Sequence, residues 1–118
     1  MIPTRIHGAI DYVVGVILIL APFFIGFADG GPAQWVPVTI GVLTIIFSLL
    51  TRYELGAFRV LPMPVHLAID VLSGVLLLAS PWILGFADRI WWPHVVFGAA
   101  YIIIPLLTAR HSPLDSAD

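Results

Sequence analysis

Four apolar runs follow one another along the chain, at residues 10–25, 36–50, 65–84 and 95–107. With their flanking residues they approach the roughly 20 residues that a helix needs to cross the hydrocarbon core of a bilayer. Turn-forming and polar residues separate the runs: Gly and Pro follow Asp29, a longer mixed stretch occupies 52–64, and Asp88 and Arg89 precede the last run. The pattern predicts an all-α integral membrane protein, a bundle of four transmembrane helices.

The runs belong to two copies of one unit. Residues 7–29 match residues 66–88 at a constant offset of 59, with 12 of 23 positions identical. The match resumes at an offset of 57, so that Thr51 corresponds to Thr108. Each copy is therefore a helix, a turn and a second helix. An even number of crossings per copy gives both hairpins the same orientation, as parallel repeats related by a pseudo-two-fold axis along the membrane normal.

The repeat divides a single membrane domain, 1–118, into parts. Repeat 1 covers 6–51, a cytoplasmic loop covers 52–64, repeat 2 covers 65–108, and we expect a disordered tail at 109–118. Arginines set the orientation, because cytoplasmic loops carry an excess of Lys and Arg. Arg89 lies alone on one side of the predicted helices, and four arginines lie on the other: Arg5, Arg52, Arg59 and Arg110. We therefore expect a multi-pass protein of the cell (plasma) membrane with both termini in the cytoplasm.

Composition supports this class and excludes others. The chain is 60% hydrophobic and 10% charged, whereas about 25% of the residues in soluble domains are charged. The absence of cysteine excludes disulfides and thiol chemistry. The net charge is −2 without a basic cluster, so nucleic acid is not an expected partner. The expected partner is the lipid bilayer, together with a membrane protein or a second copy of the chain.

The candidate chemistry lies in a repeated His-x-x-x-Asp motif. His7 and Asp11 return as His66 and Asp70, and residues four apart share one face of a helix. We expect the four side chains to gather at the cytoplasmic end, where imidazole and carboxylate can pair as a polar clasp. Three alternatives stay open: a proton or ion site used in transport, a metal site, because two His and two Asp suit a tetrahedral ion, and haem held by His7 and His66. No cofactor is predicted outright.

The same helix face continues with small residues. Gly15 and Gly74 follow the aspartates by four positions, and glycine lets membrane helices approach closely. We expect these glycines to bring the first and third helices together. Pro22 and Pro81 are expected to kink or end those helices.

The turns between the paired helices carry further expectations. Gly26 and Gly85 should permit the chain to reverse, and Asp29 and Asp88 should cap the helices that follow. His94 is expected to face the outer headgroups. Tyr12 and Tyr53 are expected at the inner membrane interface.

One motif resembles a known family. Ser80-Pro81-Trp82 followed by Gly85-Phe86-Ala87-Asp88 is similar to the motif that names the SPW repeat family, although Ala21-Pro22-Phe23 stands at the same place in the first copy. The resemblance covers nearly the whole chain. It implies a membrane protein built from one or two copies of a two-helix unit, and it implies no established biochemical activity. We find no catalytic set and expect no enzyme, so a structural or partner-binding membrane module is favoured.

Overall fold

The computed structural model describes residues 1–51 and 53–110. The chain forms α1 (Thr4–Ala21), which continues as a π-helical turn η1 (Pro22–Gly26), and then α2 (Pro32–Leu50), α3 (Met63–Ile83) and α4 (Trp92–Leu106). Within the described residues there are no strands, only two isolated bridges. The prediction of an all-α fold is confirmed. Arg52 and all but two residues of the expected tail 109–118 lie outside the described residues.

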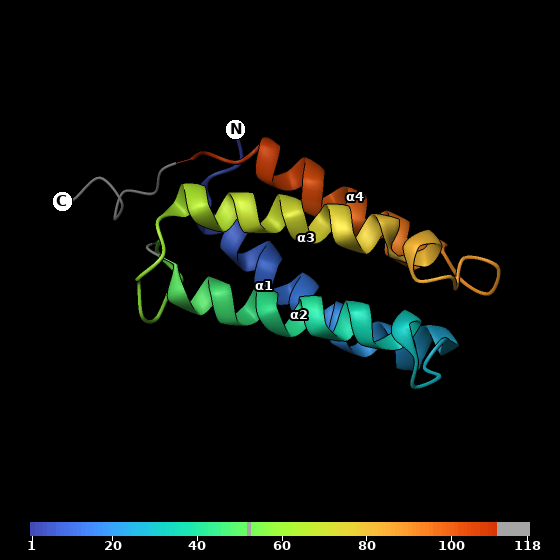
Figure 1. Cartoon of the computed structure of the whole chain (residues 1–118). Coiled ribbons are helices and arrows are strands. Elements are labelled where there is room, and N and C mark those ends of the chain that lie inside the picture. The colour runs from blue at the N-terminus through green and yellow to red at the C-terminus, as the bar shows by residue number, and fades with distance from the viewer. Residues whose placement is uncertain (52, 111–118) are drawn as a thin grey trace.

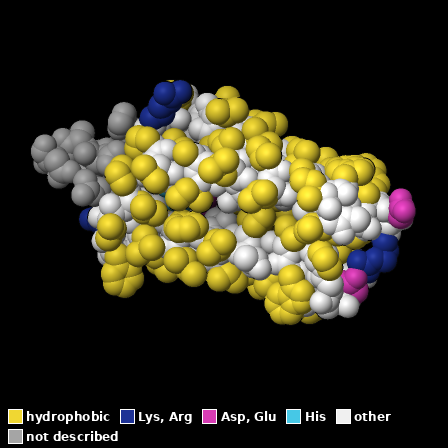
Figure 2. Space-filling model, viewed as in Figure 1, with side chains coloured by type: hydrophobic (Ala, Val, Ile, Leu, Met, Phe, Trp, Pro, Cys, Tyr) yellow, Lys and Arg dark blue, Asp and Glu magenta, His cyan; other side chains and the backbone are white. Residues whose placement is uncertain are grey.

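Three helical segments are long and apolar enough to cross a membrane: Thr4–Gly26, Pro32–Leu50 and Met63–Ile83. The fourth helix is apolar but has only 15 residues. The molecule measures 49 × 22 × 18 Å, and its long dimension exceeds the roughly 30 Å of a bilayer core. In Figure 2, apolar side chains cover the length of the visible face, and the charged side chains lie at its two ends.

The helices pack as two pairs, α1 with α2 and α3 with α4 (Figure 1). Glycines make both contacts close. A Cβ added to Gly41 would lie 2.6 Å from the carbonyl oxygen of Gly15, and one added to Gly74 would lie 2.7 Å from that of Gly98. Gly15 and Gly74 therefore pack helices within each pair. The expectation that they join the first helix to the third is wrong, because the small residues face the helix that follows in the chain.

The turns at one end follow the prediction in part. Gly26 and Gly85 have φ of 99° and 77°, a backbone conformation that costs glycine little. The α-helical hydrogen bonding of α1 ends at Ala21, before Pro22, as expected. Pro81 lies within the last turn of α3, which ends at Ile83.

The opposite end collects both described chain ends and the loop between α2 and α3 (Figure 1). Ile2 bridges to Thr108 after α4, and Leu61 bridges to Thr51 after α2. The residues before α1 thus lie against the residues that follow α4. The residues before α3 lie against those that follow α2. Tyr53 in this loop is fully buried against Gly8, so the expectation that it lies at the membrane interface is wrong.

Candidate functional site

The four residues of the repeated motif meet inside the bundle. His7 and Asp11 come from α1, and His66 and Asp70 come from α3. All four are buried, and none exposes more than 7% of its surface. Their Nε2 and Oδ2 atoms form a ring in which nitrogen and oxygen alternate. Its four sides measure 3.1, 2.6, 3.2 and 2.8 Å.

The two short sides of the ring are the ones that cross between helices. His7 Nε2 lies 2.8 Å from Asp70 Oδ2, and His66 Nε2 lies 2.6 Å from Asp11 Oδ2. The pairs within one helix, His7 with Asp11 and His66 with Asp70, are separated by 3.1 and 3.2 Å. Each histidine is therefore hydrogen-bonded to the aspartate of the other helix. The imidazole rings meet edge to face with centroids 5.5 Å apart.

Two threonines complete the site, and the sequence reasoning did not include them. Thr108 Oγ1 lies 2.9 Å from His7 Nδ1, and Thr51 Oγ1 lies 2.7 Å from His66 Nδ1. Both hydroxyls are fully buried and donate to the carbonyl four residues earlier, that of Ile104 or Phe47. The available signal was the repeat itself, since Thr51 and Thr108 occupy matching positions in the two copies.

These hydroxyls determine which nitrogen of each imidazole carries a proton. A threonine hydroxyl has one proton, and here that proton is directed at a backbone carbonyl. With its proton on the carbonyl, the threonine oxygen accepts from Nδ1, which favours the tautomer of His7 and His66 that is protonated at Nδ1. In a neutral imidazole the other nitrogen, Nε2, then has a lone pair. Both lone pairs are directed at carboxylate oxygens.

A lone pair and a carboxylate oxygen at 2.6–2.8 Å repel unless something positive lies between them. Two protons, one in each crossed pair, would make both contacts favourable and leave the cluster neutral. A single divalent cation at the centre of the ring would do the same. The arrangement can therefore hold protons or a metal ion, and in either state it links α1 to α3.

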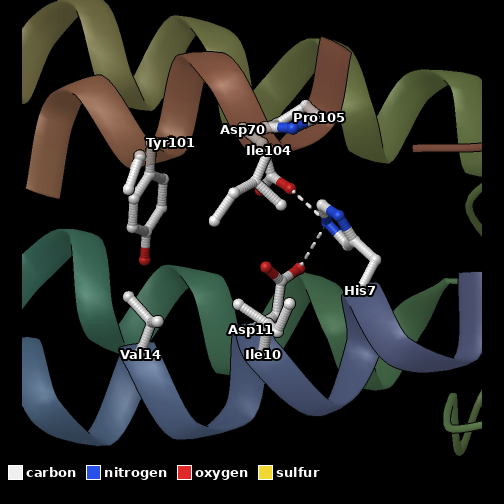
Figure 3. A pocket seen from close by; sticks show the side chains of 9 residues that line it. His7, Ile10, Asp11, Val14, Asp70, Tyr101, Ile104 and Pro105 are labelled. Atoms are coloured by element: carbon white, nitrogen blue, oxygen red, sulfur yellow. Dashed lines mark hydrogen bonds and ion pairs between the residues drawn. The ribbon is translucent and has the colours of Figure 1, made fainter. Parts of the chain in front are cut away.

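Further polar groups differ between the two halves of the site. Ser48 donates to Asp11 Oδ2 at 3.4 Å, whereas the position that matches Ser48 in the second copy is Pro105. A cavity of about 10 Å³ lies there, lined by His7, both aspartates, Tyr101 and Pro105, among others (Figure 3). A cavity of about 10–15 Å³ holds one water molecule.

The site has no room for haem. Neither this cavity nor the 5.5 Å between the centroids of the imidazole rings accommodates a porphyrin, so the haem alternative does not fit.

His94 is the third buried histidine, and its expected place among the outer headgroups is wrong. It is 1% exposed and its ring packs between Phe27 and Phe86. Nε2 donates to the carbonyl of Ala33 at 2.8 Å. His94 therefore ties the start of α4 to the start of α2. It belongs to the apolar packing at the end far from the cluster.

The two aspartates of the outer turns behave differently from each other. Asp29 accepts a hydrogen bond from the backbone N–H of Gly31, the residue that precedes α2, and it pairs with Arg89. This bond satisfies the N–H of the residue before the helix, but α2 has no side-chain cap bond, so the expectation that Asp29 caps the helix is wrong. Asp88 does not cap α4, because the capping position is Trp91, which makes no side-chain cap bond. The Asp29–Arg89 pair joins the two turns.

The SPW repeat domain matches residues 5–108. The chain belongs to the SPW repeat family. It matches no curated protein and no solved structure. The family motif lies in the last turn of α3, where Ser80 and Pro81 are buried and Trp82 is 58% exposed.

The Ser80 hydroxyl donates to the carbonyl of Leu77 at 2.7 Å. The serine of the family motif thus satisfies the backbone of its own helix. Pro81 has no backbone N–H to donate to the helix, so the chain can change direction after it. The motif therefore shapes the end of α3, and it lies far along the helix from Asp70.

Proposed function

We propose that the protein is a membrane module of two parallel hairpins that cross the bilayer four times, held together by the His/Asp cluster as a polar clasp. Its task in this proposal is structural: it presents a fixed four-helix surface to lipid, to a membrane-protein partner or to a second copy. The observation that carries the proposal is the crossed bonding of the cluster. Each histidine is bonded to an aspartate and a threonine of the other repeat.

Matching contacts support a pseudo-two-fold relation between the hairpins. His7 with Thr108 corresponds to His66 with Thr51 under the offsets of 59 and 57. The bridge between Ile2 and Thr108 corresponds in the same way to the bridge between Leu61 and Thr51. The side chains of Thr44 and Tyr101 occupy matching positions and bond to each other at 2.6 Å. Such a contact is expected on the axis itself.

The distribution of charge supports the proposed orientation. Arg5, Arg59 and Arg110 lie at the end that holds both described chain ends and the loop between α2 and α3. Arg89 lies at the other end, where Asp29 pairs with it. The excess of arginine favours the first end as cytoplasmic. The clasp then lies near the cytoplasmic side of the membrane.

The physical case for a clasp rests on the cost of leaving its groups unpaired. Interhelical hydrogen bonds in membranes contribute only about 0.6 kcal/mol on average. A charged aspartate costs about 2.5–3.5 kcal/mol at the centre of the membrane on insertion scales, and less toward the interface, where the clasp is proposed to lie. The pairing therefore stabilises the joined state mainly by avoiding unpaired groups in each hairpin alone. The cost of unpaired histidines and aspartates would also disfavour any other register between the two hairpins.

The test is a chain cut between the hairpins. A protease site inserted after the exposed Phe58 lets the two halves be separated in the folded, detergent-solubilised protein. The halves of the otherwise unaltered protein are expected to stay associated after cleavage. With Asp11→Ala and Asp70→Ala together, we expect dissociation and lower thermal stability, because both Nε2 atoms lose their partners. The measurement is size-exclusion chromatography with a tag on one half, in the presence of a chelator.

Asp88→Ala is the matched control, because it removes an exposed carboxylate from the opposite end. Its halves should behave like those of the cut but otherwise unaltered protein. If the Asp11/Asp70 variant keeps its halves together with an unchanged thermal midpoint, the cluster is not a clasp. Solute transport receives less support, since the cavity beside the cluster admits about one water molecule.

A further inference from the structure

We infer that the clasp is a binding site for one divalent first-row transition-metal ion, ligated by His7 Nε2, His66 Nε2 and a carboxylate oxygen each from Asp11 and Asp70. The inference rests on the proposed clasp, because it assigns a ligand to the same four residues. No motif of known metal spacing points to it. It follows from how the two helices bring a pair of ligands from each repeat to one point.

The donor atoms already surround a common centre. One ligand atom from each of the four residues can be chosen so that all lie within 4.8 Å of one another. With metal–ligand bonds of about 2.0–2.2 Å, neighbouring donors lie about 2.8–3.1 Å apart in a flat ring and about 3.3–3.6 Å apart in a tetrahedron. The four observed sides are 2.6, 2.8, 3.1 and 3.2 Å. To hold an ion, the two short sides would have to lengthen and the widest donor separation, up to 4.8 Å, would have to shorten by a few tenths of an ångström or more.

The two threonines supply the outer hydrogen bonds that metal sites require. Histidine ligands nearly always donate their second N–H to an acceptor, which fixes the tautomer and the ring orientation. Thr108 and Thr51 are such acceptors for Nδ1 of His7 and His66. Because both hydroxyls are committed to backbone carbonyls, they keep each Nε2 lone pair directed at the ring centre.

Charge and ligand type indicate the class of ion. Two carboxylates and two neutral imidazoles carry a charge of −2, which one divalent cation neutralises in a buried site. Mixed nitrogen and oxygen donors suit zinc and its first-row neighbours. Calcium and magnesium prefer oxygen donors alone. The cavity of about 10 Å³ that adjoins the aspartates also leaves room for one water molecule as an additional ligand.

The experiment measures binding to the full-length protein in detergent. Chelator-treated protein is titrated with Zn²⁺ by calorimetry, and with Co²⁺ by visible absorption, with Mg²⁺ and Ca²⁺ as negative probes. We expect one Zn²⁺ or Co²⁺ per chain, d–d bands on Co²⁺ binding, and a thermal midpoint that rises with Zn²⁺ concentration. Mg²⁺ and Ca²⁺ should produce no rise.

Three variants locate the ion. His66→Gln should abolish the Co²⁺ bands. His94→Gln, which alters a buried histidine outside the cluster, should keep them. Thr108→Val should keep the stoichiometry and the bands but weaken Zn²⁺ binding about 10–100-fold, as loss of an outer partner does. If His66→Gln does not fold, the Thr108→Val affinity and the titration of the unaltered protein still decide the matter.

The absence of stoichiometric Zn²⁺ and Co²⁺ binding by the unaltered protein would overturn the inference. So would Co²⁺ bands that persist in His66→Gln. Either result leaves the clasp intact if the Asp11/Asp70 variant still separates in the chelator-treated, cut-chain experiment. Conversely, metal binding with no effect of that variant on the chelated protein removes the clasp and keeps the metal site.

Discussion

At the scale of single residues, hydrogen-bond donors and acceptors decide what the cluster can be. The sequence predicted that His7, Asp11, His66 and Asp70 would meet, and the structure brings them together. The sequence left open whether the pairs form within or across the helices, and it did not predict the two threonines. The crossed pairing depends on how α1 and α3 lie against each other, and the threonine bonds depend on where the residues after α2 and α4 meet the other hairpin. A helical repeat specifies which side chains share a face, but it does not specify how the helices are placed against each other.

Thr51 and Thr108 should contribute equally to stability, because they make corresponding hydrogen bonds to His66 and His7. Thr51→Val and Thr108→Val each leave a buried Nδ1–H without an acceptor, which costs about 1–3 kcal/mol. We expect both variants to lower the free energy of unfolding by similar amounts in detergent, measured by thermal or denaturant unfolding. Thr39→Val, at an exposed position of α2, is the control and should change stability little. If only one of the two threonine variants lost stability, the two hydroxyls would not have equivalent roles.

Asp29 offers a residue-scale prediction outside the membrane. The backbone N–H of Gly31 and, less strongly, Arg89 hold the pKa of the Asp29 carboxyl below its usual value. Because the folded pKa is the lower one, this carboxylate favours the folded turn above its ordinary pKa of about 3.9, and the contribution is lost as the pH falls further. Carboxyl NMR should show a midpoint below about 3.9.

Arg89→Gln separates the two causes of that shift. The midpoint should rise in this variant and still remain below the ordinary value, because the Gly31 hydrogen bond persists. An unchanged midpoint would mean that Arg89 does not act on Asp29. A midpoint at the ordinary value would mean that the Gly31 bond is not formed in solution.

At the scale of elements, glycine marks where helices approach but does not identify the partner. Gly15 and Gly74 were expected between the first and third helices. Each instead meets the second helix of its own hairpin, at Gly41 and Gly98. The sequence contains those partners at matching positions of the repeat. His94 was misplaced for a related reason: a polar residue among tryptophans near a helix start resembles an interface residue, and only packing reveals Phe27 and Phe86 around it.

These close approaches predict that alanine in place of an interhelical glycine destabilises the protein. In an isolated helix, alanine is favoured over glycine by about 1 kcal/mol. At Gly41, however, an added Cβ would lie 2.6 Å from the Gly15 carbonyl oxygen, and overpacking costs about 1–3 kcal/mol. Gly41→Ala should therefore destabilise the protein in thermal unfolding, as should Gly98→Ala in the other hairpin.

Gly31→Ala is the matched control for this pair. Its added Cβ would make only ordinary contacts, the nearest at 3.5 Å to Asp29. Gly31 is the N-cap of α2, where alanine is less favourable than glycine, so we expect at most a small loss of stability that does not come from overpacking. A neutral Gly41→Ala variant would indicate that α1 and α2 are further apart in the membrane than in this structure.

At the scale of the whole molecule, the two hairpins are tied at both ends. The His/Asp cluster joins them near one end, and the pair of Asp29 with Arg89 joins their turns at the other. The two ties differ in strength. Solvent screens an ion pair between exposed side chains, so it contributes little to stability and the buried cluster dominates. The apolar pattern was sufficient to predict an all-helical membrane chain, and its shortest run, 95–107, corresponds to the shortest α-helix, α4.

The proposed orientation can be tested because the chain has no cysteine. Single cysteines replace Glu54, in the loop between α2 and α3, or Asp88, in the turn before α4. In intact cells a membrane-impermeant thiol reagent should label Asp88→Cys. It should label Glu54→Cys only after the membrane is permeabilised, because the arginine-rich end faces the cytoplasm. The reverse pattern would place the termini outside.

The residues near the two described chain ends lie side by side. Ile2 and Ala109 share a backbone hydrogen bond of 2.9 Å, so a short linker can join the residues around them without moving a helix. The loop between α2 and α3 can then be opened to give new ends at the same end of the molecule. The result is a circular permutant in which α3 and α4 precede α1 and α2. Because the His–Asp and His–Thr contacts that each hairpin supplies to the other correspond, we expect the permuted chain to fold in the same way, whichever hairpin is synthesised first.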